Sequence, residues 1–83
     1  MQKTKYNAKS LAAMYNLSYR TFFYYLKPHR KALEELATIR EHKGKKIISP
    51  TYNSHQLRYI IEMVFKDTPE GYGFNGNYFY KLD

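Results

Sequence analysis

The chain has no cysteine, and it contains only four glycines and three prolines among its 83 residues. Without cysteine it has neither a disulfide framework nor a cysteine-based zinc site, so side-chain packing has to stabilise the fold. An apolar content of 43% and an aromatic content of 18% exceed what a disordered chain shows. We therefore expect one domain over residues 1–83, because the chain is too short for a second independent core.

Long apolar runs are absent as well. The first ten residues, MQKTKYNAKS, lack the apolar segment of a signal peptide. No run approaches the roughly 18 residues that a membrane-spanning helix requires. We expect a soluble, cytoplasmic protein that has no membrane partner.

Patterns that support catalysis are missing too. The carboxylates are scattered, no Ser/His/Asp arrangement positions a nucleophile, and there is no glycine-rich phosphate loop. His29, His42 and His55 lie on three different segments without the spacing of metal ligands. The sequence thus predicts a protein that is not an enzyme and holds no cofactor or metal.

Acidic residues are absent from the first 33 positions. Seven basic residues lie there, namely Lys3, Lys5, Lys9, Arg20, Lys27, Arg30 and Lys31. Residues 34–83 carry seven basic and seven acidic residues, so the net charge of +7 is concentrated in the first part of the chain. Such a focused positive field indicates a polyanionic partner.

The same part of the chain has the pattern of a helix-turn-helix over residues 6–27. Leu11, Ala12 and Tyr15 form the apolar face of a first helix, which Asn7 is suited to cap. Asn16 tolerates the left-handed conformation of a helix stop, and Ser18 is a suitable N-cap for a second helix.

The second helix begins at Tyr19 and is expected to end at Pro28. It buries Phe22, Tyr25 and Leu26 in this interpretation. Its free face carries Tyr19, Arg20, Phe23, Tyr24 and Lys27, although burial is the favoured outcome for Phe23. A short exposed helix with these side chains fits a DNA major groove.

Three further segments complete the prediction. Helical spacing at Leu33, Leu36, Ala37 and Ile39 predicts a helix over 29–42, with Gly44 as its stop. Residues 43–53 form a basic wing and loop, in which Ile47 and Ile48 favour a strand. A helix over 54–66 begins with Ser54 as N-cap and packs Leu57, Ile60, Ile61 and Val64 on the helix-turn-helix.

Residues 67–83 form an aromatic tail. Asn75-Gly76 between aromatic residues is typical of a hairpin turn. Such a hairpin has two open outcomes: it lies against the Ile47–Ile48 strand, or it stays mobile until a partner covers it.

The order of these elements resembles the winged helix-turn-helix of MerR-type regulators and phage excisionases. The segments that match are LAAMYNLSYRTFFYYL, Gly44 with Lys45-Lys46-Ile47-Ile48, and the helix opened by Ser54 with LRYII. SYRTFFYYLKPH is also similar to small helix-turn-helix proteins of unassigned role from gut bacteria. The resemblance covers about Tyr6 to Phe65 and implies DNA contacts by the second helix and the wing.

The chain departs from that family in four ways. Phe23 stands where the family often has arginine, Asn16 stands where glycine is usual, and the connection from Lys31 to Lys43 is longer. The chain also has neither the long dimerisation helix nor the effector domain of MerR-type regulators. An excisionase-like or small regulatory protein is therefore the better comparison, and no small-molecule ligand is expected.

We thus predict a mainly α fold with a small β component, a winged helix-turn-helix of three to four helices and a short hairpin. Its function would be to bind double-stranded DNA as a bacterial transcriptional regulator or excisionase-like factor. The residues predicted to contact DNA are Ser18, Tyr19, Arg20, Tyr24, Lys27, Arg30, Lys31, Lys43, Lys45 and Lys46, and Lys3 and Lys5 are free to reach phosphates. The alternatives are a homodimerisation or protein-interaction module that uses the tail and last helix, and a single-strand binder that uses tyrosines.

Overall fold

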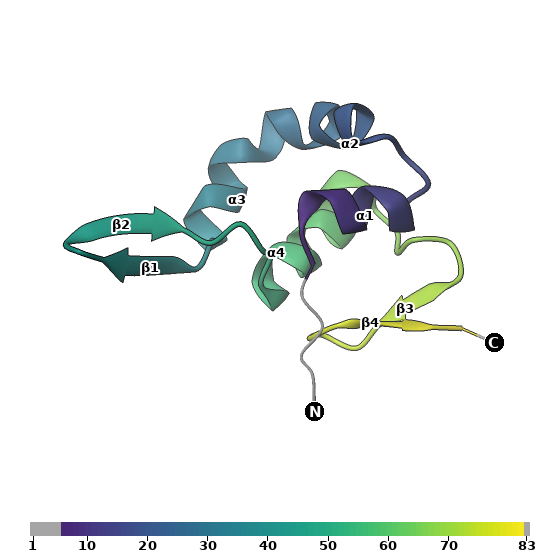
Figure 1. Ribbon diagram of the computed structural model, residues 1–83. Helices are drawn as coiled ribbons and strands as arrows, with labels where there is room; N and C mark the ends of the chain where they lie inside the picture. Colours follow the sequence, from purple (N-terminus) through teal and green to yellow (C-terminus); the bar gives the residue numbers. More distant parts are fainter. Residues whose placement is uncertain (1–5, 83) are drawn as a thin grey trace.

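The computed structural model describes residues 6–82 as short helices with two separate antiparallel hairpins (Figure 1). The helices gather in the middle, and the two hairpins extend from them in different directions. This arrangement confirms a mixed architecture of helices and small hairpins. Lys3, Lys5 and Asp83 lie outside the described residues.

Helix α1 (Ala8–Met14) and helix α2 (Tyr19–Leu26) are joined by a tight turn, as predicted. Asn7 caps α1 in a reciprocal capping box with Ser10. At the other end Asn16 has a φ of 58°. The amide groups of Asn16 and Leu17 donate to the carbonyls of Ala13 and Ala12, which is the Schellman pattern that satisfies the last carbonyls of a helix.

Helix α2 ends at Leu26, just before Pro28, as predicted. A 3₁₀ turn, Lys27–His29, leads directly into α3 (Arg30–Leu36). Pro28 occupies an early position of that turn, where its missing N–H removes no helical hydrogen bond. Helices α2 and α3 therefore follow one another with only a change of direction (Figure 1).

The predicted helix over 29–42 is wrong beyond Leu36. Ala37 is extended, and Ile39–His42 form strand β1, which pairs with β2 (Lys45–Ile48). Lys43 and Gly44 both have positive φ, 50° and 77°, as the central residues of a two-residue type I′ hairpin turn require. Gly44 thus belongs to a hairpin turn and does not end a helix.

Helix α4 (Ser54–Tyr59) continues into a π-helical segment, Ile60–Val64. The N-cap is Asn53, where Ser54 was predicted. Asn53 is favoured because Gln56, three residues later, completes a capping box with it. The π-helical segment ends just before Lys66, whose φ is 59°.

The core lies between the helix-turn-helix and α4. Leu11, Phe22, Leu57 and Ile60 are its most deeply buried side chains, as the periodicity predicted. Tyr25 was expected there too, but 47% of its surface is exposed. Tyr25 reaches only the edge of the Phe65 ring, at 5.5 Å between ring centroids, because Phe22 and Leu26 already occupy the buried side of α2.

The tail forms the predicted hairpin, with strands β3 (Tyr72–Phe74) and β4 (Phe79–Lys81). It makes a sheet of its own and does not pair with the Ile47–Ile48 strand. Tyr6 holds it in place: the Tyr6 hydroxyl accepts a hydrogen bond from the Phe79 amide at 2.9 Å, and the two rings meet edge to face. Because Phe79 is buried, the tail is packed without any partner.

Candidate nucleic-acid interface

One face of α2 is open to solvent. It carries Arg20, Phe23 and Lys27 at positions i, i+3 and i+7, all exposed, so the three side chains lie on one side of the helix. Tyr24 is the most exposed of the aromatic residues of α2, at 73%. Phe23, for which burial was expected, is 42% exposed, because no element of residues 6–82 covers it.

The two residues at the start of α2 are engaged within the helix. The Ser18 hydroxyl accepts from the Thr21 amide at 3.2 Å and donates to the Thr21 hydroxyl at 2.9 Å. Its hydrogen is thereby used in capping. Tyr19 packs edge to face on Phe23, with ring centroids 4.6 Å apart, so the two rings form an exposed aromatic pair.

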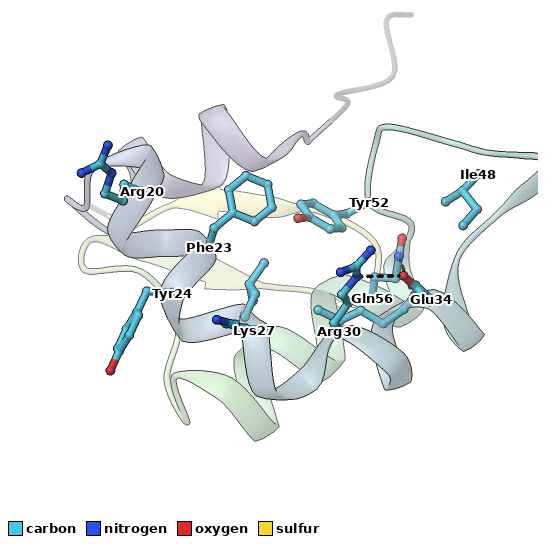
Figure 2. Close-up of a pocket in the computed structure, with 11 residues that line it drawn as sticks. Arg20, Phe23, Tyr24, Lys27, Arg30, Glu34, Ile48, Tyr52 and Gln56 are labelled. Carbon is cyan, nitrogen blue, oxygen red and sulfur yellow. Dashed lines mark hydrogen bonds and ion pairs between the residues drawn. The ribbon is translucent and has the colours of Figure 1, made fainter.

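A depression of about 670 Å³ separates α2 and α3 from the base of the β1–β2 hairpin (Figure 2). Its lining includes the cations Arg20, Lys27 and Arg30, the Glu34 carboxylate, and the apolar side chains of Phe23, Tyr52 and Ile48, while the buried Leu26 and Leu33 lie deepest. The Phe23 ring points towards Tyr52, whereas the Tyr24 ring points outward, away from the depression. The depression therefore combines apolar surface with three cations and one carboxylate.

A second hollow, of about 730 Å³, adjoins the first because Phe23 and Tyr52 line both. It extends towards Lys9 and Tyr19. Tyr52 was not identified from the sequence, since a single aromatic residue in a loop has no periodicity. Its amide donates to the Tyr6 carbonyl at 2.7 Å, and burial, with Tyr19 nearby, raises the pKa of its phenol.

The basic residues that follow α2 differ in the hydrogen bonds they already make and in where they lie relative to the depression. Arg30 Nε donates to Glu34 Oε1 at 3.1 Å, so one edge of its guanidinium is occupied while the terminal nitrogens have no partner in residues 6–82. Lys27 is exposed and lines the depression. Lys31 is exposed on α3 but lies outside the lining of the depression.

The β1–β2 hairpin carries the three predicted wing lysines. Lys43 is in the turn, while Lys45 and Lys46 are successive residues of β2 and so point to opposite faces. Lys46 shares a face with Ile48, and its cross-strand partner is Glu41. Lys45 is paired with His42 on the other face. The sequence-based prediction grouped two lysines that the strand separates.

Asn53 fixes the position of the hairpin relative to the helices. Its Oδ1 caps α4, and its Nδ2 donates to the Leu36 carbonyl at 2.7 Å and to the Thr38 hydroxyl at 3.0 Å. The Ser49 amide donates to the Thr38 carbonyl at 2.9 Å and closes the base of the hairpin. One side chain thus joins the end of α3, the start of β1 and α4.

A buried side chain supports this junction. Gln56 is buried, and its Nε2 donates to the Leu33 carbonyl at 3.0 Å. Its other amide atom accepts from the Asn53 backbone. Because a buried amide is costly unless it is hydrogen-bonded, the contact with Asn53 holds the Gln56 side chain at the start of α4, and the contact with Leu33 joins α4 to α3.

Side chains that could bind a metal ion do not gather at one place in the described residues. Among residues 6–82, no three His, Cys, Asp or Glu side chains gather as they would around a metal ion. His29 is engaged with the Tyr59 hydroxyl at 2.8 Å. No helix within that range combines the length and apolar character needed to cross a bilayer.

Comparisons with known proteins place no further constraint on the site. No family model, no curated protein and no solved structure matches the chain.

Proposed function

We propose that this protein is a winged helix-turn-helix that binds double-stranded DNA and has no catalytic activity. The observation that carries the proposal is the single face shared by α2 and the base of the β1–β2 hairpin, with Arg20, Lys27 and Arg30 around it. An α-helix with its side chains is about 10–12 Å in diameter, which fits the roughly 12 Å width of the major groove.

In this proposal α2 lies in the major groove, and the β1–β2 hairpin is a basic wing on the adjacent backbone. Arg20, one residue into α2, donates to the edge of a guanine, for which its guanidinium has the right geometry. Lys27 and, from the wing, Lys43 and Lys46 contact phosphates and supply most of the affinity, whereas Lys45 lies on the other face of β2. Ser18 contributes to DNA binding by capping α2, since its hydroxyl hydrogen is already donated to Thr21.

A single module of this kind buries only about 600–1,000 Å² of protein surface on DNA. Tight and specific binding therefore requires a second copy or a partner protein. We accordingly propose a regulator or accessory factor that acts at paired sites, located in the bacterial cytoplasm.

The test is site selection on random duplexes, followed by titrations of the selected site with Arg20→Ala. We expect the substitution to cost about 1–3 kcal/mol and to relax the preference at one base position. Arg58→Ala is the matched control, because Arg58 lies on α4 beside Gly76 of the tail. Equal losses in both variants would show that only net charge matters and that α2 does not read bases.

The alternative proposal is a protein-interaction surface on the tail hairpin. It is favoured by the exposure of Tyr78, Tyr80 and Leu82. The apolar residues Leu57 and Ile60 of the last helical region are buried inside the chain and do not contribute. A salt-insensitive dimer in sizing experiments, together with no duplex binding, would favour this alternative.

A further inference from the structure

The depression between α2 and the wing lies between the two elements proposed to touch DNA. Its lining combines apolar side chains with three cations, Arg20, Lys27 and Arg30, and one carboxylate, Glu34. A face that only pressed against phosphates would need no apolar surface. The chemistry of the depression thus calls for a ligand with alternating anionic and apolar parts.

The geometry points to one strand of the duplex, which we propose lies in this depression with its deoxyriboses against the apolar side chains and its phosphates at the cations. This inference rests on the proposed function. The major and minor grooves of a duplex are separated by a single sugar–phosphate strand. A protein with a helix in the major groove and a wing beyond the adjacent backbone therefore has to straddle that strand, and the depression is the space between the two.

Each part of the strand has a matching partner. Phe23, Tyr52 and Ile48 present carbon surface to the deoxyribose rings. Arg30 presents its terminal nitrogens to a phosphate, since its Nε is held by Glu34 at 3.1 Å, and a fixed guanidinium edge suits two phosphate oxygens. Lys27, one turn earlier, meets the neighbouring phosphate as a mobile point charge.

The first experiment replaces single phosphates of the selected duplex by uncharged methylphosphonates, one position at a time on each strand. We expect the wild-type protein to lose affinity at two or three consecutive positions on one strand. In Arg30→Gln and in Lys27→Gln, the methylphosphonate at one of these positions should no longer reduce affinity. The reason is that the substitution has already removed the side-chain charge that pairs with the phosphate there. Arg58→Gln, which removes the same charge from α4, should keep the wild-type pattern.

The second experiment places a negative charge inside the depression. Ile48→Glu should weaken duplex binding by about tenfold, since the carboxylate repels the phosphates. Ile47→Glu is its matched control, because it makes the same change at the next residue, on the opposite face of the hairpin. Both isoleucines are about half exposed, so folding is retained in both variants, which circular dichroism verifies.

Two outcomes overturn the inference separately from the proposed function. Suppose that the protein binds the duplex, but that the methylphosphonates reduce affinity equally in the wild type, in Arg30→Gln and in Lys27→Gln. In that case no strand lies in the depression. Equal losses for Ile48→Glu and Ile47→Glu lead to the same conclusion. If the wild-type protein binds no duplex at all, the proposed function and this inference fall together.

Discussion

The sharpest prediction concerns Asn53, whose one side chain joins α3, the wing and α4. Its Oδ1 caps α4, and a lost N-cap costs about 1 kcal/mol. Its Nδ2 makes two further hydrogen bonds, to Leu36 and Thr38, each worth about 0.5–1.5 kcal/mol net. Asn53→Ala removes all three, so we expect the free energy of unfolding to fall by about 2–4 kcal/mol.

For a chain of this size, 1 kcal/mol corresponds to a change in Tm of about 4–8 °C. The expected decrease in Tm for Asn53→Ala is therefore about 8–30 °C, measured by thermal unfolding followed by circular dichroism. The amide protons of the wing give a local readout. Exchange at Ser49, whose amide donates to Thr38, should accelerate more than exchange at Leu57, which is buried in the core.

Asn53→Asp separates the two roles. Aspartate keeps the cap, and its charge is favourable at a helix N-terminus, but it has no hydrogen to donate to Leu36 or Thr38. We expect a loss of about 1 kcal/mol and the same fast exchange at Ser49. If Asn53→Asp matched the wild type in both measurements, the amide would contribute nothing to holding the wing, and the reasoning would be wrong.

Three more predictions follow from backbone strain, burial and charge. Lys66 has a φ of 59°, in the left-handed region that glycine adopts without strain. Lys66→Gly should therefore raise the free energy of unfolding by up to about 1 kcal/mol in urea titrations. A decrease would mean that the Lys66 side chain makes a stabilising contact. Burial, with the Asp67 charge nearby, raises the pKa of the Tyr15 phenol. As pH rises above about 10, the unfolded chain therefore loses this proton before the folded chain does, and the free energy of unfolding should fall. The fall should be smaller in Tyr15→Phe. Lys46→Gln should reduce the slope of log K against log salt by about 0.9 on any duplex, Lys45→Gln on the opposite face of β2 should reduce it less, and Glu41→Gln should raise affinity; an unchanged slope for Lys46→Gln would remove the wing from the interface.

The helix-turn-helix was predictable because its signals are local. Asn7, Asn16 and Ser18 each act within a few residues through their own side chain or backbone conformation, and those preferences are readable in a sequence. The Asn53 cap was readable by the same logic, since Gln56 follows it at capping-box spacing. Ser54 was preferred only because it stands next to the helical pattern.

The strand at Ile47 and Ile48 was predicted, but the first strand of the wing was mispredicted as helix, because its pairing is not local. Leu33, Leu36 and Ile39 are helically spaced, yet Ile39 is opposite Ile48 in the hairpin. The deciding feature is the Lys43-Gly44 turn, and lysine is uncommon at its first position because its Cβ is strained there. Within β2 the separation of Lys45 from Lys46 follows only once the strand is recognised.

The candidate site was predictable in part. The openness of the α2 face around Arg20 follows from the apolar stripe that the helix buries on its other side. The depression does not, because it depends on Tyr52, which comes from a loop and is held by the backbone of Tyr6. Contacts between residues so far apart in the sequence produce no periodic pattern from which they could be predicted.

The bond between Tyr6 and Phe79 spans 73 positions, and this has a consequence for synthesis. During synthesis Tyr6 cannot make this contact until Phe79, 73 residues later, has emerged from the ribosome. The helical core around Leu11, Phe22, Leu57 and Ile60 can form before that point, whereas the Tyr6 ring stays exposed. Docking of the tail hairpin is therefore a late step in the folding of this domain.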